Sequence, residues 1–468
     1  MGDLLSLLTN ASQSLTGAQG AAATAASNIQ NVNTPGYSRQ QANIETGLPG
    51  DLYNGVYLGQ GSRLASVTQV RDRFLEAQVP YAFGQASYSK IKSEALGAVH
   101  TFDPGRPGGV GEALSGFFDS LRQLSQNPSD RTLRQGTVNA GKNLEIAFQR
   151  SARDIESARS GLDGKLSGLV DEVNRLAKQV SGLNKQIKLA RLTSRAEPND
   201  LLDSRQKAMD RLSELTGATQ VPDEAGQVTL ALPKGGALVS GEFSATLSTR
   251  VDSANNGHLK LMLTSSGSST ASAVSADSVS GEIGGLLSAR DTALKTAMDD
   301  IDTLAFDLAA AVNAKHSAGM GLDGSTGNSL FTVGSTSTGA ARLFSVNSAI
   351  AADPTLLATG RGAGSGDNAA VHDLVGLETT ALPSGDAPVN ALAAITGAFG
   401  AQAQEAKAAA DHDGALREHL ENMRDSVSGV SIDEEMVQMT KAQRAYEAIS
   451  RVINTSNAML DTLLKLGS

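Results

Sequence analysis

Residues 4–32 read LLSLLTNASQSLTGAQGAAATAASNIQNV, and this stretch decides the fold at the N-terminus. Its apolar residues recur at alternating intervals of four and three. An average spacing of 3.5 residues keeps one narrow stripe of a helix facing a partner helix, which is the seam of a coiled coil. The seam positions are Leu4, Leu8, Ala11, Leu15, Ala18, Ala22, Ala25, Ile29 and Val32.

The C-terminus carries a second seam of two rows. One row is Ile432, Met439, Tyr446, Ile453 and Leu460, and its companion row is Met436, Gln443, Ser450, Asn457 and Leu464. Gln443 and Asn457 have two interpretations, because a polar seam residue can fix helix register and a solvated position is also polar. We expect a chain with a seam at either end to bring its ends together in an antiparallel arrangement.

Both terminal seams are weak. Burial of apolar surface stabilises by about 25 cal/mol per Å², so the many alanines of the first seam contribute little. Ordering the backbone costs about 1–2 kcal/mol per residue, and Gly17 and Gly20 weaken the helix by up to ~1 kcal/mol each. We therefore expect both ends to be poorly ordered in the monomer and to become helical on assembly.

Two further stripes with the same spacing lie in the middle of the chain. We interpret them as core-facing helices of an ordinary bundle, with Arg159 and Asp291 as polar exceptions. Residues 71–215 are expected to be mainly helical, with breaks at 103–109 and 127–130. The central stripes are Ile155, Leu162, Leu166, Leu169, Val173, Leu176, Val180, Leu183, Ile187 and Ala190, and Leu287, Leu294, Met298, Ile301, Ala305, Leu308 and Val312.

A smaller β part interrupts the helices. Between residues 219 and 264 the apolar period becomes two, as in Val228, Leu230 and Leu232, which predicts strands. Asn54-Gly55 predicts a hairpin turn, and residues 341–346 a further strand. The fold class is therefore mainly α with a smaller β part. Its expected domains are a terminal coiled-coil region (1–45 and 425–468), an elongated mainly helical domain (46–215 and 281–424) and a small inserted β domain (216–280).

Composition excludes several classes of function. The 468 residues include 39 Lys and Arg against 49 Asp and Glu, a formal charge of −10, which argues against nucleic-acid binding. Cysteine is absent, so disulfides and thiolate metal sites are excluded. No run of 18 apolar residues occurs, and the first residues lack a basic region and an apolar core. We expect neither membrane insertion nor a cleaved signal peptide.

No catalytic, cofactor-binding or metal-binding constellation is evident. The G-x-G-x-x-G match at Gly319–Gly324 follows a helical pattern instead of a strand, so we interpret it as a helix-terminating loop. His412 and His419 share a helix face but lack a third ligand, and a solvated surface is the simpler interpretation. The expectation is a protein without catalysis or cofactor.

The sharpest loop motif is NVNTPGYSRQ at residues 31–40. Pro35 prevents simple continuation of the preceding helix, and Pro35-Gly36 fits the centre of a type II turn in which Gly36 takes a positive φ. Tyr37 supplies an amphipathic anchor after the turn. A mere helix stop would also explain the Pro and the Gly.

These residues resemble a known family. ASNIQNVNTPGYSRQ at 26–40 is similar to the N-terminal signature of flagellar rod, hook and hook-associated proteins, and residues 434–467 are similar to the matching C-terminal end. Further stretches resemble the members of that family at the hook–filament junction. They are YSRQQANIET (37–46), GVYLGQG (55–61), RDRFLEAQV (71–79), SGEIGGLLSARD (280–291), AVNAKHSAGMGLDGSTGNSLF (311–331) and AADPTLLA (351–358).

The resemblance implies a structural role outside the cell, after export through the flagellar type III apparatus without cleavage. The implied partners are copies of the chain in a ring or tube, hook protein below, the next hook-associated protein or filament above, and an export chaperone. The terminal seams would pair helices of different subunits, and the turn would redirect the chain from an inner tube to the outer body. The turn residues are Asn31, Asn33, Pro35, Gly36, Tyr37, Ser38, Arg39 and Gln40.

Two alternatives stay open. The chain could be another axial protein, such as a hook or distal rod subunit. A cell-wall hydrolase on a flagellar scaffold would need two carboxylates flanking a cleft, and the sequence offers no such pair that we can identify.

Overall fold

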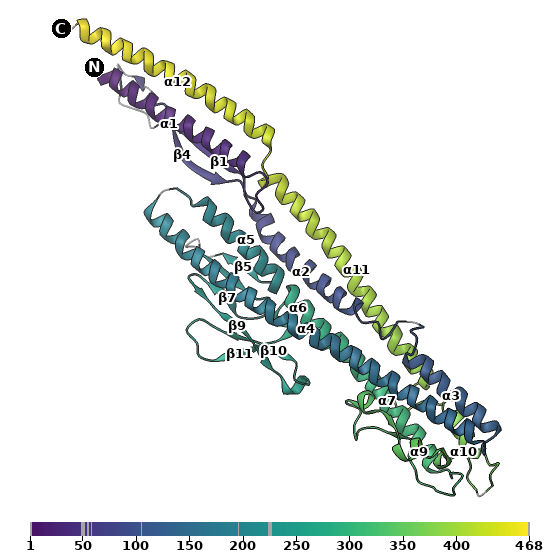
Figure 1. Ribbon diagram of the computed structural model, residues 1–468. Coiled ribbons are helices and arrows are strands. Elements are labelled where there is room, and N and C mark those ends of the chain that lie inside the picture. The colour runs from purple at the N-terminus through teal and green to yellow at the C-terminus, as the bar shows by residue number, and fades with distance from the viewer. Residues whose placement is uncertain are drawn as a thin grey trace.

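The computed structural model describes residues 2–47, 52–53, 56–57, 59–103, 105–194, 196–222, 227–362 and 364–466. The molecule is elongated, with long helices along its axis and both chain ends at one tip (Figure 1). Short strands are attached beside the helices. The predicted fold class, mainly α with a smaller β part, is confirmed.

One tip is formed by what we call the terminal module, made of the helices α1 (Gly2–Gln30) and α12 (Ile432–Leu466) and the strands β1 to β4. The two helices lie side by side and antiparallel, as expected for the two ends (Figure 1). Strands β1 (Gln40–Thr46) and β4 (Ser62–Gln69) pair antiparallel and contact α1. Strands β2 (Leu52–Tyr53) and β3 (Val56–Tyr57) also pair antiparallel, while the predicted turn residues Asn54 and Gly55 lie outside the described residues.

Two glycines allow β4 to lie close to α1. A Cβ atom on Gly20 would lie 2.6 Å from Cδ2 of Leu64, and one on Gly17 would lie 3.5 Å from the Leu64 backbone nitrogen. Gly17 and Gly20, which weaken α1 as an isolated helix, therefore have a packing role.

The body consists of long helices that run along the same axis. The longest is α4 (Arg131–Thr193), whose 63 residues span about 95 Å. The Asp130 carboxylate accepts hydrogen bonds from the amides of Thr132 and Leu133 and so caps its first turn. The other long helices are α2 (Arg73–Gly97), α3 (Val110–Gln126), α5 (Asn199–Thr216), α7 (Leu294–Ser317) and α11 (Pro388–Ser428). The helix breaks predicted at 103–109 and 127–130 are confirmed in the described residues.

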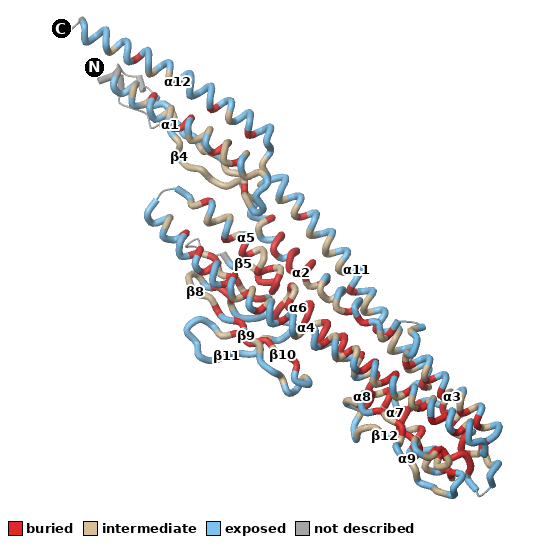
Figure 2. Tube along the Cα trace, in the orientation of Figure 1, coloured by how far each residue is buried: buried red, intermediate tan, exposed pale blue. Residues whose placement is uncertain are grey.

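The core of the body follows the predicted central stripes. Every residue of the two stripes is buried or half-buried, and buried residues concentrate along α2, α4, α7 and the short helix α6 (Gly281–Ser288) (Figure 2). The exception Arg159 is fully buried and satisfied, because its Nε donates to the Arg290 carbonyl at 3.2 Å and its Nη2 to Asn255 Oδ1 at 2.7 Å. Arg290 lies in a short π-helical segment, Ala289–Ala293, between α6 and α7.

Two small antiparallel sheets lie beside α4. The first has the order β5 (Thr219–Pro222), β6 (Val228–Ala231), β7 (Ala237–Ser240) and β8 (Phe243–Ser244). The second has the order β11 (Ala271–Val274), β10 (Leu259–Thr264) and β9 (Thr246–Val251). The predicted alternation holds, since Val228, Leu230 and Leu232 are buried. These strands fall inside the interval 216–280, although the division into domains itself stays a proposal.

The strand predicted at 341–346 is wrong over most of its length. Residues Ala340–Leu343 form a short helix, α8, and only β13 (Ser345–Val346) is a strand, paired with β12 (Phe331–Thr332). The Asp302 carboxylate on α7 accepts hydrogen bonds from the amides of Gly339 (2.7 Å) and Ala341 (2.9 Å), which holds the start of α8 in place. Two more short helices follow, α9 (Ser348–Ala352) and α10 (Ala369–Gly376).

Candidate assembly region

The predicted seam of α1 faces partners within the same chain. Ala11, Ala18 and Ala25, seven residues apart, are buried, and the other described seam positions are half-buried. The helix packs on α12 and on β4. The side chain of Leu4 lies outside the described residues. The half-buried positions are Leu8, Leu15, Ala22, Ile29 and Val32.

The two predicted rows of α12 have different surroundings within the chain, and their role as an interface between copies stays a prediction. Met439, Ile453 and Leu460 are half-buried, whereas Ile432 and Tyr446 in the same row are exposed. The companion row that faces α1 lies one residue earlier than predicted, at Glu435, Ala442, Ile449 and Ser456. The small side chains of Ala442 and Ser456 let α12 approach the alanine-rich face of α1. The longer side chains of Gln443 and Asn457 would keep the two helices further apart.

The predicted companion row is therefore not the contact with α1. Met436 is 54% exposed and Leu464 is 61% exposed, while Gln443 and Asn457 are exposed and Ser450 is half-buried. Contact between copies through Met436 and Leu464 stays a prediction. The exposed large apolar residues of α12 are Ile432, Met436, Val437, Tyr446, Val452, Met459, Leu463 and Leu464.

The motif at 31–40 forms the predicted turn. The Tyr37 amide donates to the Thr34 carbonyl at 3.2 Å, and Gly36 has a φ of 80°, as the third residue of a type II turn requires. Asn33 and Pro35 are exposed. Asn31 closes the end of α1, because its Nδ2 donates to the Ser27 carbonyl at 3.0 Å.

Asn28 joins four segments at the base of the terminal module. It is fully buried, and its Nδ2 donates to the Gln40 carbonyl at 2.8 Å and to Glu435 Oε2 at 3.0 Å. Its Oδ1 accepts from the Gln40 amide at 2.9 Å and from the Tyr37 hydroxyl at 2.8 Å. One amide side chain thus ties the end of α1 to the turn, to β1 and to the first turn of α12. Burial raises the pKa of the Tyr37 hydroxyl.

Glu435 and Arg39 continue this contact across the two ends of the chain. Arg39 Nε lies 2.7 Å from Glu435 Oε1, and its Nη1 lies 3.1 Å from Glu434 Oε2. The Arg39 amide also donates to the Ser428 carbonyl at 2.9 Å, at the end of α11. The Glu435 side chain is only 4% exposed, and its buried charge accepts from two donors, Asn28 and the oppositely charged Arg39.

A second group of polar residues ties the module to α5. Asp203 Oδ1 accepts from Arg71 Nη2 at 2.7 Å and from Gln69 Nε2 at 2.8 Å, and Oδ2 accepts from the Ser38 amide at 3.4 Å. Burial raises the pKa of the Asp203 carboxyl, and the charge of Arg71 opposes that shift. We call these two groups the polar junction: Asn28, Tyr37, Ser38, Arg39, Gln40, Arg71, Asp203 and Glu435.

The chain does not enter the body at the turn, contrary to the expectation from the sequence. After Gly36 it returns along α1 as β1, and it passes into the body only at residues 70–72, after β4. It leaves the body again at residues 429–431, between α11 and α12. The reason is local, since the β1–β4 ladder packs on the glycine face of α1 through Leu64.

Four members of the polar junction were missed from the sequence. Asn28 and Glu435 stand inside the two terminal signatures, and Arg71 begins the stretch RDRFLEAQV, so each had a signal. Asp203 had none, because nothing in its helical surroundings distinguishes it from a solvated carboxylate.

The remaining sequence candidates lie apart from this region. Gly319–Gly324 follows the end of α7 as a loop, as interpreted, and His412 and His419 are exposed on α11. Among the described residues, no three His, Asp or Glu side chains are grouped so that they could hold a metal ion. Within the same part of the chain, no helix has the length and apolar character needed to cross a bilayer.

The fold and the polar junction define a class of protein: an elongated helical chain whose two distant ends are joined in one module. Residues 101–331 match the family model described as flagellar hook-associated protein FlgK helical domain. Residues 424–466 match the model of the flagellar basal body rod FlgEFG protein C-terminal. In these two matches the chain is similar to flagellar axial proteins, and over nearly its whole length it is similar to flagellar hook-associated protein 1.

Individual relatives show this similarity. Flagellar hook-associated protein 1 of Bacillus subtilis is 28% identical over an alignment of 494 residues, which covers 98% of this chain and 97% of the relative. The Escherichia coli protein of that name is 24% identical over 550 residues, with 98% and 100% covered. The Salmonella typhimurium protein is 28% identical over 336 residues, and the match spans only 60% of its length.

A solved structure shares part of the fold. It is described as the structure of the flagellar hook junction protein FlgK from Burkholderia pseudomallei. The TM-score is 0.51 at 27% identity, and the match covers 55% of this chain and 47% of that chain.

Proposed function

We propose that this chain is a structural component of the bacterial flagellum that forms the junction between hook and filament by self-assembly through its terminal helices. The observation that carries the proposal is the exposed apolar surface of α12. Helix α1 covers only one side of α12, and most of α12 is coloured as exposed in Figure 2. Large apolar residues are among the exposed residues along its length. Many large apolar residues left exposed on one helix indicate a surface that a partner covers.

The arrangement suits a repeated contact between copies. Both chain ends lie at one tip, so a neighbour can reach α1 and α12 together (Figure 1). A contact that joins two different surfaces of identical copies builds a ring or a helical tube. The terminal module then lies inside the tube and the body points outward, without catalysis.

The partners follow from the same proposal. Hook protein lies below the assembled copies, and the next hook-associated protein or filament lies above them. An export chaperone escorts the chain, which leaves the cell through the flagellar type III apparatus and acts outside it. The names of the relatives, flagellar hook-associated protein 1 and a flagellar hook junction protein, support this placement.

A second candidate is another axial subunit of the hook or distal rod. The match of residues 424–466 to the rod-protein C-terminal model favours it, because that end is shared across axial proteins. The match of residues 101–331 to the hook-associated helical domain favours the junction.

Electron microscopy of cells that lack this chain tests the proposal. We expect intact hooks without attached filaments, and an antibody against the chain should label the boundary of hook and filament in wild-type cells. Label along the whole hook would favour the second candidate, and filaments attached normally in the absence of the chain would refute the junction role.

A further inference from the structure

The outward face of the C-terminal half of α4 carries a basic stripe. Its residues alternate at intervals of three and four, the spacing of one helix face. All of them are exposed, whereas Val173, Val180 and Ile187 on the opposite face are buried. Arg175, Lys178 and Lys185 form no ion pair with any described residue. The basic stripe is Arg175, Lys178, Gly182, Lys185, Leu189 and Leu192.

The outward face of α11 carries an acidic stripe with the same spacing. Its inward face is fixed by Arg417 and Arg424, whose guanidinium carbons lie 4.4 and 5.7 Å from the ring centre of Phe83 on α2, and by the buried Leu420. The acidic stripe is exposed throughout. Two of its anions have a cation nearby on the same helix, since Asp411 lies 3.1 Å from Lys407 Nζ and Asp425 lies 3.8 Å from Arg424 Nε. It consists of Ala408, Asp411, Ala415, Glu418, Asn422 and Asp425.

We propose that the basic stripe of one copy binds the acidic stripe of the neighbouring copy, so that the bodies as well as the terminal modules join the assembly. This inference rests on the proposed function, because it needs copies placed side by side. The anions Asp411, Glu418 and Asp425 repeat every seven residues, and so do Lys178 and Lys185. Seven residues rise about 10.5 Å along a helix, so the two rows of charge stay in step.

Small residues in both stripes allow the helices to approach closely. Gly182 lies between the cations, and no atom lies within 4 Å of where its Cβ would be. Ala415 takes the corresponding place between Asp411 and Glu418, and Ala408 precedes Asp411. Close approach shortens the distances between opposite charges and strengthens their attraction.

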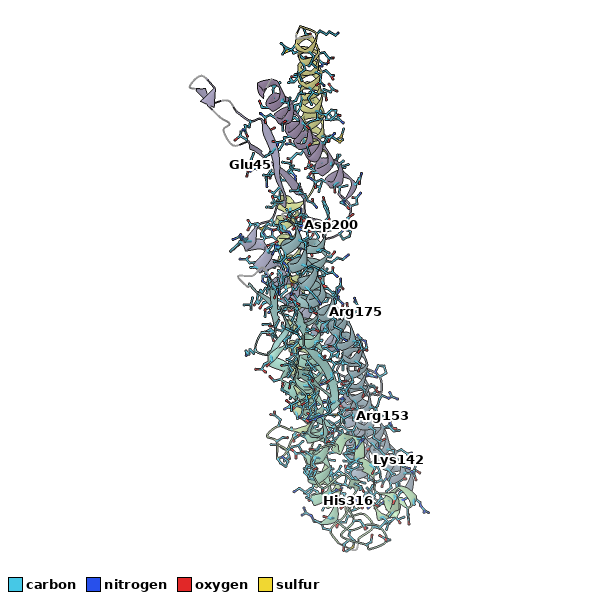
Figure 3. The ribbon with its side chains drawn as sticks, turned by 90° about the vertical axis from the view of Figure 1, so that its left-hand side faces the viewer. Glu45, Lys142, Arg153, Arg175, Asp200 and His316 are labelled. Atoms are coloured by element: carbon cyan, nitrogen blue, oxygen red, sulfur yellow. The ribbon has the colours of Figure 1, made fainter. Side chains whose placement is uncertain are left out.

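The two stripes belong to different sides of one molecule. Helix α11 lies along one edge of the body, and α4 lies across the α2 and α5 layer from it (Figure 1). Figure 3 shows Arg175 on the α4 edge, with Arg153 and Lys142 following it along the same edge. A contact between unlike surfaces of two copies is heterologous and repeats around a ring or along a helix.

A second copy fits the basic stripe better than an unrelated polyanion does. The acidic stripe supplies the required charge with the required repeat. Such a contact gives the assembly its lateral orientation and is weakened by salt.

Charge reversal tests the inference in cells that express the full chain from its own locus. The variants K178E/K185E and D411K/E418K should each lower incorporation into purified hook–filament structures by roughly tenfold, because like charges then face one another. The quadruple variant should restore incorporation. The control K165E changes an exposed cation of α4 outside the stripe and should incorporate normally. Failure of the quadruple variant to recover would overturn binding between copies and point to another anionic partner.

A disulfide crosslink tests directly whether the basic stripe of one copy lies against the acidic stripe of its neighbour. Because the chain has no cysteine, G182C/A415C introduces the only two thiols. Mild oxidation of assembled structures should give a ladder of disulfide-linked multimers, and each single variant should stay monomeric. If the double variant is incorporated but forms no multimers, this inference is wrong while the proposed function stands. If antibody finds the wild-type chain absent from flagella, the proposed function falls and the inference falls with it.

Discussion

At the scale of single residues, Asn28 is the side chain on which the terminal module most depends. All four of its hydrogen bonds go to other segments, and its partners include a buried carboxylate. Asn28→Ala leaves Glu435 short of one donor and the Gln40 amide without its acceptor. We expect the variant to lose about 1–3 kcal/mol of stability in the module.

Hydrogen exchange of the N-terminal turn of α12 measures this loss. The control Asn33→Ala removes an asparagine five residues away that is exposed and makes no hydrogen bond among the described residues. Equal exchange in both variants would show that the buried amide contributes nothing.

Tyr37 gives the polar junction a dependence on alkaline pH. Burial raises the pKa of its hydroxyl in the folded state above the ordinary value of about 10. The folded state therefore holds this proton more tightly than the unfolded state does. Its contribution to stability is complete below pH about 10 and is lost as the pH rises through the folded-state pKa. Tyr37→Phe should remove this dependence, so the stability difference between wild type and variant should shrink as the pH rises above about 10 in urea unfolding.

The residues of the polar junction show where sequence reasoning stops. The turn at Pro35-Gly36 was predictable because its conformation is set by its own two residues. The contact of Asn28 with Glu435 joins positions 407 apart, and no spacing rule relates them. The same holds for Ser38 with Asp203, which are 165 residues apart.

At the scale of elements, the stripes of α4 and α7 were predictable because Leu, Val and Ile at a period of 3.5 leave one face to bury. The face of α12 that packs on α1 was not predictable from the sequence. A second row could lie three residues after Met439 and Ile453, at Ala442 and Ser456, or four residues after them, at Gln443 and Asn457. Each of these two rows contains a polar residue, so polarity does not decide between them. The row of Ala442 and Ser456 packs on α1 because the partner residues on α1 are small. The sequence of α12 alone does not reveal this.

The tight contact between α1 and α12 makes a specific prediction. Ala25 is 2% exposed at that contact, so a larger side chain overpacks it. Ala25→Leu should destabilise the module by about 1–3 kcal/mol, although leucine is the better residue for a generic seam. Thermal unfolding and exchange of α12 amides measure the effect. Ala23→Leu makes the same change at an exposed position two residues earlier and should be neutral, and a stabilising Ala25→Leu would show that the helices can separate freely.

At the scale of the whole molecule, the terminal module and the body do not share an apolar core. The two clusters of buried apolar residues contain members only from Leu75 to Leu420 among the described residues. The module is joined to the body through the polar junction and two crossings of the chain. The module has few buried apolar residues of its own, and polar contacts and ion pairs contribute less than apolar burial, so the module has the lower stability.

This division predicts two separate unfolding steps in the free monomer. Buried residues of α4 are spread over its length, whereas Glu435, Ala442 and Ser456 are the buried described residues of α12. Hydrogen exchange at increasing urea should show α1 and α12 opening first, by local unfolding, while residues 155–187 of α4 exchange only through global unfolding. Assembly then covers the exposed face of α12 and should slow its exchange by orders of magnitude. Equal protection of α12 and α4 in the free monomer would mean that the ends are already stable alone, and the terminal helices would then gain no order from binding their neighbours.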